Sequence, residues 1–107
     1  MDTSLPVSVA EPAPGSFVLT GEFDIASVAE VRERLLGAHG DVSIDCSGVT
    51  FVDAAGLGMF VALHRHCEER GAQLVVIDPS PPMRRLMGLT SLFEIFHVVE
   101  GGRARES

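Results

Sequence analysis

The chain has 107 residues, a length that fits one domain with a single ordinary hydrophobic core. Fifteen acidic residues against eight basic ones give a formal charge of -7, so the chain lacks the basic surface that nucleic-acid binding requires. Its longest nearly apolar stretch, residues 54–63, is far shorter than the roughly 20 residues of a membrane span. With two cysteines and no basic, apolar leader, the sequence predicts a reduced, cytoplasmic domain without direct membrane insertion.

The first predicted feature is a hairpin near the N-terminus. Short apolar segments at residues 5–9 and 16–20 flank AEPAPG, whose prolines and glycine are typical of a turn. The polar or Gly/Arg/Glu-rich ends, residues 1–4 and 100–107, are predicted to be flexible. The ordered domain is therefore expected to span residues 5–99.

After the hairpin the pattern changes to a helical period. Ser27 followed by Glu30 fits a capping box, and Gly37 or Gly40 is placed to end the helix. The apolar residues recur at spacings of three and four: Ile25, Val28, Val31 and Leu35. We therefore expect an amphipathic first helix with these four residues on its buried face.

The second half alternates strands and helices. The elements expected are a strand that begins at Val42 and leaves through a Ser-Gly turn, a helix over 54–70, a strand over 72–78, a helix over 82–89 and a last strand in IFHVV. The strand over 72–78 has four consecutive apolar residues, as is typical of a central strand covered on both faces. The whole order predicts an α/β fold with helices packed on a mixed, mostly parallel sheet of four or five strands.

The turn DAAGLG, at the start of the second helix, raises a question of function. If Asp53 is the N-cap, its carboxylate accepts from the N–H of Ala55 or Gly56. Position 55 then lies in the first turn, where unpaired N–H groups and the helix dipole favour an anion. A serine there would be well placed for phosphorylation, but alanine cannot be phosphorylated.

Four segments in order resemble the STAS domain, the fold of bacterial anti-sigma factor antagonists: GEFDIASVAEVRERL, DCSGVTFVDAAGLGMFVALHR, AQLVVID and MRRLMGLTSLFEIFHV. The resemblance covers about residues 5–99. It implies a regulator of transcription that binds an anti-sigma factor, itself a GHKL-type serine/threonine kinase. In phospho-regulated members the loop is Asp-Ser-Ser-Gly-Leu-Gly or Asp-Ser-Thr-Gly-Leu-Gly, and phosphorylation of its second hydroxyl breaks the complex.

Carried onto this chain, the family loop is matched at Asp53, Gly56, Leu57 and Gly58, whereas Ala54 and Ala55 replace the two hydroxyl residues. Ala55 stands at the phosphoacceptor position, so the resemblance implies binding without this switch. The family usually continues into a further helix after the last strand. EGGRARES is too short and too rich in glycine to predict one.

The predicted partner-binding surface is the loop, the first turns of the helix and the acidic turn after the second strand. Leu57, Met59 and Phe60 span most of a helical turn, so at least one is expected to face solvent or a partner. The full set is Asp24, Ser27, Asp53, Ala54, Ala55, Gly56, Leu57, Gly58, Met59 and Phe60. The simpler alternatives are a well-capped helix start, a solvated acid at Asp24 and a helix cap at Ser27.

Other hydroxyls and cysteines have simple structural explanations. Ser47 and Thr50 are expected in the loop before Asp53, where a kinase could use them, although turn chemistry already explains a serine there. A Cys46–Cys67 bridge is not expected, because the two residues are placed about 20 Å apart by the rise of the helix.

The remaining motifs also favour structure over chemistry. His64 and Cys67, three apart in HRHC, suggest metal binding, but no second cluster supplies further ligands. The sequence has no G-x-S-x-G elbow and no G-x-x-x-x-G-K loop, so neither an enzyme nor a cofactor is predicted. MRRLMGL predicts core plus surface, with Met83, Arg84 and Arg85 as a possible rim of a partner site.

Two other functions stay open at the level of sequence. Some ABC-type lipid-transport complexes carry a free-standing STAS accessory subunit on their ATPase, and in these the second loop hydroxyl can also be alanine. A scaffold subunit of a larger STAS assembly is the third possibility. The sequence predicts neither the identity of the partner nor an oligomeric state.

Overall fold

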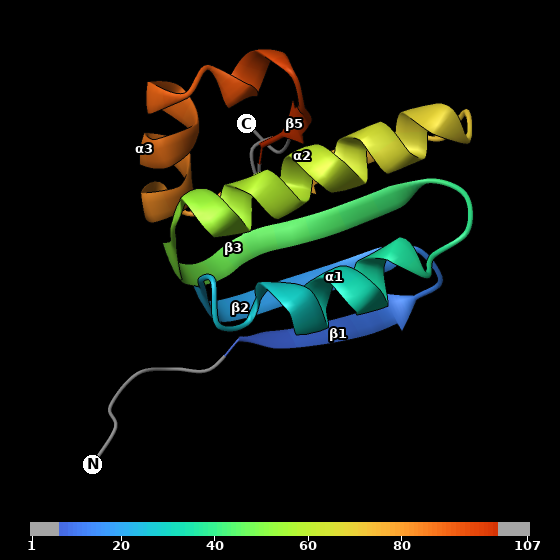
Figure 1. Ribbon diagram of the computed structural model, residues 1–107, viewed down its shortest axis with the longest axis horizontal. Helices are drawn as coiled ribbons and strands as arrows, with labels where there is room; N and C mark the ends of the chain where they lie inside the picture. Colours follow the sequence, from blue (N-terminus) through green and yellow to red (C-terminus); the bar gives the residue numbers. More distant parts are fainter. Residues whose placement is uncertain (1–6, 101–107) are drawn as a thin grey trace.

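The chain folds into five strands, three α-helices and one 3₁₀ helix, in the predicted order (Figure 1). The computed structural model describes residues 7–100. The elements are β1 (Ser8–Ala13), β2 (Ser16–Phe23), α1 (Val28–Leu36), β3 (Val42–Val52), α2 (Ala54–Glu69), β4 (Leu74–Ile77), α3 (Pro81–Leu89), η1 (Leu92–Glu94) and β5 (His97–Val99). The predictions for residues 1–6 and 101–107, including the flexible ends, lie outside the described residues.

The sheet is mixed, with strand order β1-β2-β3-β4-β5. β1 is antiparallel to β2 and all the other pairs are parallel, as predicted. Each parallel connection moves one strand further in the same direction, and right-handed connections of this kind place successive helices on one face. Figure 1 shows α1 and α2 side by side on that face, and the two helices are in contact.

The opposite face of the sheet is less covered. In β4, Leu74 and Val76 are buried under the helices, whereas Val75 and Ile77 on the other face are only half-buried. The expectation that this strand is central and covered on both faces is therefore wrong. Four consecutive apolar residues fit a strand second from the edge, because its neighbours shield part of the outer face.

The opening hairpin is confirmed, with a tighter turn than expected. β1 continues through Glu11 and Pro12, and Pro14 and Gly15 make the turn, with Gly15 at φ +80°. The register between β1 and β2 shifts across residues 10–13. A proline is tolerated there because β1 is an edge strand and the irregularity relaxes the ladder.

β3 is longer than expected and carries the candidate site at its end. It runs through Ser47 and Gly48 to Val52, so the predicted Ser-Gly turn is wrong, and Ser47 and Thr50 lie in a strand. A Cβ on Gly48 would lie 2.7 Å from the Thr20 Cγ2 of β2, so glycine lets the two strands approach here. Only residues 42–45 of β3 pair with β4, and α3 packs against β3.

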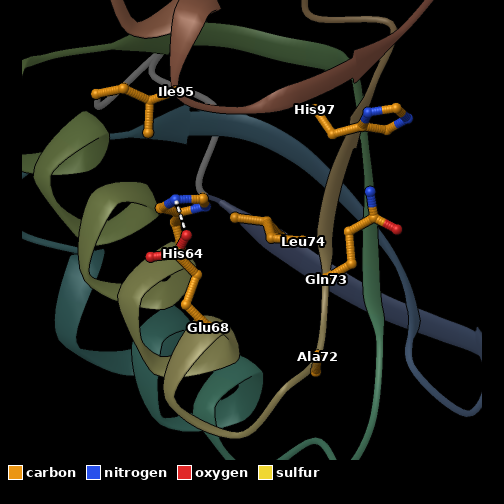
Figure 2. A pocket seen from close by; sticks show the side chains of 7 residues that line it. All are labelled: His64, Glu68, Ala72, Gln73, Leu74, Ile95 and His97. Atoms are coloured by element: carbon orange, nitrogen blue, oxygen red, sulfur yellow. Dashed lines mark ion pairs between the residues drawn. The ribbon is translucent and has the colours of Figure 1, made fainter.

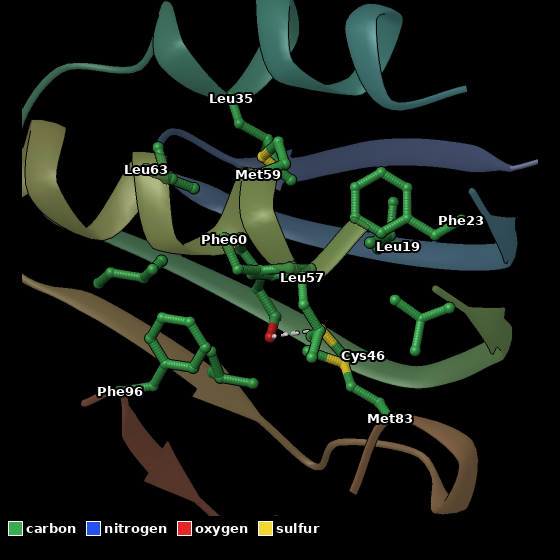
Figure 3. Close-up of a cluster of buried hydrophobic side chains, with 14 of the residues drawn as sticks. Leu19, Phe23, Leu35, Cys46, Leu57, Met59, Phe60, Leu63, Met83 and Phe96 are labelled. Atoms are coloured by element: carbon green, nitrogen blue, oxygen red, sulfur yellow. Dashed lines mark hydrogen bonds between the residues drawn. The ribbon is translucent and has the colours of Figure 1, made fainter. Parts of the chain in front are cut away.

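The core lies between the sheet and its helices, and Figure 3 shows a central part of it. Phe60 of α2 is fully buried; its ring centroid lies 5.7 Å from that of Phe23 and 6.2 Å from that of Phe96. Val31 and Leu35 of α1 are buried as predicted. Ile25 is 74% exposed and precedes the helix, so its expected place on the buried face is wrong.

Candidate functional site

The start of α2 is held by the predicted side-chain cap. The Oδ1 of Asp53 accepts a hydrogen bond from the Gly56 N–H at 3.0 Å, and the Asp53 carbonyl accepts from the Leu57 N–H at 3.1 Å. Of the two donors that the sequence left open, Ala55 and Gly56, the structure selects Gly56. The cap ties the chain leaving β3 to the first turn of the helix, so the loop has a fixed geometry.

Gly56 is required by packing. A Cβ at this position would lie 2.8 Å from the Phe23 carbonyl oxygen, 2.8 Å from the Val52 Cγ2 and 3.0 Å from the Phe23 Cδ2. Gly58, one half-turn further along, has no atom within 4 Å of such a Cβ. Gly56 therefore allows α2 to pack closely against the end of β2. At Gly58 a side chain would project into open space.

The large side chains of the predicted binding surface belong to the core. Leu57, Met59 and Phe60 are respectively 3%, 4% and 0% exposed, so the expectation that at least one faces solvent or a partner is wrong. The reason is that α2 is enclosed on several sides. In Figure 3, Leu35 of α1 lies near Met59, while Phe60 lies between the rings of Phe23 and Phe96.

The solvent-facing part of the helix start is made of small residues. Ala54 and Gly58 are exposed, and Asp53 and Ala55 are half-buried. These positions present methyl groups, backbone and one carboxylate. Ala55 brings no hydroxyl to the first turn, so this position cannot be phosphorylated.

The turn between β2 and α1 lies beside this helix start. Phe23 and Val52 are partners in the parallel ladder, so Asp24 and Asp53 follow directly at adjacent strand ends. The Oδ1 of Asp24 accepts from the Ala26 N–H at 3.0 Å. This half-buried acid therefore organises its own turn next to the α2 start.

Ser27 has a different role from the predicted capping box. It occupies the N-cap position of α1, but its side chain makes no cap hydrogen bond with the helix. The hydroxyl instead accepts from the Asp24 N–H at 3.2 Å and lies 3.3 Å from the Asp24 Oδ1. The Ser27 hydroxyl therefore stabilises the turn that follows β2 and does not cap α1. The S-x-x-E pattern alone did not indicate this contact.

The HRHC segment lies in the last turns of α2, at the other end of the sheet from the helix start (Figure 2). His64 pairs with Glu68 at 3.5 Å and packs edge-on to Phe96, with ring centroids 6.0 Å apart. Within residues 7–100, no group of three or more His, Cys, Asp and Glu side chains is arranged to hold a metal ion. Burial raises the pKa of the Cys67 thiol, so this sulfur is held in its protonated form.

Both cysteines are buried and free. Burial, with a smaller contribution from the Asp45 carboxylate, raises the pKa of the Cys46 thiol far above its ordinary value. The Cys46 thiol donates a weak hydrogen bond to the Ile44 carbonyl at 3.7 Å. These sulfurs serve the core as small apolar groups.

The basic helix α3 divides into core and surface. Met83 is completely buried, so it cannot rim a partner site as suggested. Arg84 is paired with Glu100, and Arg85 is exposed. No helix in the described part of the chain is long and apolar enough to cross a bilayer.

The sequence did not predict that two large apolar residues near the start of α2 are exposed. Phe51 and Leu89 are 46% and 77% exposed. Periodicity could not assign Phe51 to the surface, because the buried positions of β3 change spacing after Gly48, from alternate residues up to Cys46 to every third residue at Val49 and Val52. The exposure of Leu89 was equally hard to predict, because it is the last residue of its helix.

Together these features define a small mixed-sheet α/β domain with one main helical layer and a rigid, capped helix start that presents small groups. The chain belongs to the STAS domain family: the family model described as "Mlab, STAS domain" matches residues 9–99. The fold and the family expected from the sequence are thereby confirmed.

Relatives and solved structures agree with this assignment. The anti-sigma-B factor antagonist of Staphylococcus epidermidis is 33% identical over 86 residues, covering 76% of this chain and 79% of the relative. The structure of the anti-sigma factor antagonist SpoIIAA in its unphosphorylated form is similar with a TM-score of 0.74 at 18% identity, covering 94% and 92% of the two chains. An anti-sigma factor antagonist from Mycobacterium paratuberculosis gives 0.70 at 23% identity, covering 90% and 86%.

Proposed function

We propose that this protein is a bacterial, cytoplasmic anti-sigma factor antagonist that binds a kinase-type anti-sigma factor and is not released from it by phosphorylation of the α2 loop. The 33% identity to an anti-sigma-B factor antagonist supports the general function. The observation that carries the proposal is the intact Asp53–Gly56 cap combined with alanine at position 55. The geometry of the helix start is kept, while the group that would be modified is missing.

The binding surface we propose consists of backbone and small side chains. Ala54 and Gly58 are exposed beside the half-buried Ala55 and the acidic turn at Asp24. A partner can therefore approach the backbone of the first turns closely. Gly56, Leu57, Met59 and Phe60 shape this surface from below, because their own atoms are buried.

Phosphorylation at position 55 would add nearly two negative charges two residues after Asp53, at a strand end adjacent to the one that Asp24 follows. In a phosphorylatable relative such a charge would alter the surface directly beneath a bound partner. Alanine removes this possibility, so the complex formed by this chain persists in the presence of ATP. We infer a regulator that acts by binding, without catalysis and without a cofactor.

The test uses matched serine variants of neighbouring positions. Wild type, Ala55→Ser and Ala54→Ser are each incubated with the co-purifying anti-sigma factor and ATP, and intact mass is measured. We expect one phosphate on Ala55→Ser alone. A phosphate on wild type would contradict the proposal, and equal phosphorylation of both variants would show that the kinase does not select position 55.

The family description also names Mlab, which favours one second candidate, an accessory subunit of an ABC-type lipid-transport complex. Affinity purification from native cells with and without detergent separates the two functions. Recovery of a soluble kinase supports the antagonist, whereas detergent-dependent recovery of a membrane ATPase supports the transporter subunit. Gly58→Arg is the matched variant, because a side chain at Gly58 projects into open space and blocks the surface without disturbing the core.

A further inference from the structure

A groove lies between the end of β3 and α3. It has a volume of about 210 Å³ and is lined by Phe51, Val52, Pro82, Arg85, Leu86 and Leu89. Phe51 and Leu89 are two of the most exposed large apolar residues among residues 7–100. Large apolar side chains at the edge of a groove are typical of a place where another molecule is bound.

The groove lies beside the helix start, because two of its lining residues end the strand that leads into α2. Val52 lines the groove and also packs against the first turn of α2. A Cβ on Gly56 would lie 2.8 Å from the Val52 Cγ2. Phe51 and Val52 directly precede the capping residue Asp53. Because only Asp53 separates the groove-lining strand end from α2, the groove and the first turn of the helix are close enough for one partner to cover both.

The chemistry of the groove favours a protein side chain over a free small molecule. Its volume is below the roughly 300–1,000 Å³ typical of small-molecule sites. Its lining is mainly apolar, and its single charged group is Arg85. Within residues 7–100 Arg84 is paired with Glu100, but Arg85 has no ion-pair partner. In a chain of net charge -7, Arg85 therefore provides a local positive charge beside an apolar surface.

We propose that this groove receives an apolar side chain of the anti-sigma factor and that Arg85 pairs with a neighbouring carboxylate of the same segment. The inference rests on the proposed function, because it extends the binding surface at the α2 start. The apolar contact with Phe51 and Leu89 supplies the anchor, and the charge pair selects acidic over basic segments. The helix start would then determine whether binding is switchable, and the groove would determine which anti-sigma factor is bound.

Photocrosslinking in native cells tests the occupant. A benzophenone amino acid is placed at position 58, in the helix-start surface, at position 89, in the groove, or at position 95 as the control. Ile95 is also a large exposed apolar residue, 45% exposed, but it lies with Leu74 near the opposite ends of the parallel strands (Figure 2). We expect positions 58 and 89 to capture the same anti-sigma factor and position 95 not to capture it. The peptide linked at position 89 should contain an apolar residue adjacent to Asp or Glu.

The failures of the two proposals are distinguishable. Capture at position 58 without capture at position 89 overturns the groove and leaves the proposed function standing. Capture of an anti-sigma factor at neither position overturns both. Capture of a second copy of this chain at position 89 also overturns the inference, since the groove would then join two copies.

Affinities measured with the captured, purified anti-sigma factor test the chemistry. Arg85→Glu should weaken binding by about tenfold, since it replaces attraction by repulsion, whereas Arg65→Glu on the exposed part of α2 should leave it nearly unchanged. Leu89→Ala should weaken binding and Ile95→Ala should not. Equal losses for both charge reversals would refute a specific pair, because they would reflect only the net charge.

Discussion

Gly56 and Gly58 provide a sharp test of how α2 is packed, because the same substitution is predicted to have opposite effects two residues apart. Alanine normally stabilises a helix by about 1 kcal/mol relative to glycine. At Gly58 nothing lies within 4 Å of the added Cβ, so Gly58→Ala should realise most of this gain. At Gly56 the same Cβ meets the Phe23 carbonyl oxygen and the Val52 Cγ2 at 2.8 Å each.

The magnitude follows from two opposing terms. Overpacking of a well-filled region costs about 1–3 kcal/mol, and here one of the contacts is a backbone atom that cannot rotate away. Set against the gain of about 1 kcal/mol in helix propensity, Gly56→Ala should lower the free energy of unfolding by about 1 kcal/mol. Gly58→Ala should raise it by about 0.5–1 kcal/mol.

Urea unfolding followed by circular dichroism measures both variants against wild type. The urea midpoints should move in opposite directions, and a change of 1 kcal/mol corresponds to a shift of roughly 0.3–1 M when m is about 1–3 kcal/mol/M. Stabilisation of both variants would refute the close approach of α2 to the end of β2. Destabilisation of both would refute the open environment of Gly58.

Three further predictions concern the cap, the thiols and the core. Asp53→Ala should lower the free energy of unfolding by about 1 kcal/mol, and Asp53→Ser should restore much of it; equal losses in urea titrations would contradict the capping role. The chain has no Tyr and no Lys, so alkaline titration of its side chains is dominated by the thiols. Because the pKa of Cys46 is raised by folding, its stabilising contribution is complete below the thiol pKa of the unfolded chain, about 8.5, and falls as the pH rises above it. Cys46→Ala should therefore reduce the loss of unfolding free energy as the pH is raised from 7 to 10. An unchanged loss in this variant would contradict the role of the Cys46 thiol. Phe60→Ala should cost about 3–5 kcal/mol, because Phe60 packs between Phe23 and Phe96, and a loss below 1 kcal/mol in the same assay would contradict its burial.

The sequence by itself determined the order of the elements and the helix start. Proline and glycine set the hairpin turn, and the change of period from two to three or four separated strands from helices. The Asp53 cap was predictable because its donor lies three residues away, within reach of one side chain. Local spacing is sufficient for such features, since the interacting groups are neighbours along the chain.

The tertiary structure decided which of these residues are available to a partner. Periodicity describes one buried stripe of a helix, but α2 is enclosed by the sheet, by α1 and by the ring of Phe96, so Leu57, Met59 and Phe60 are all buried. Likewise Ser27 matched a local capping pattern, yet its hydroxyl bonds to the Asp24 turn. The groove arises where residues more than 30 positions apart, Phe51 and Leu89, line one hollow. Burial depends on how many neighbours surround an element, and those neighbours come from distant parts of the chain.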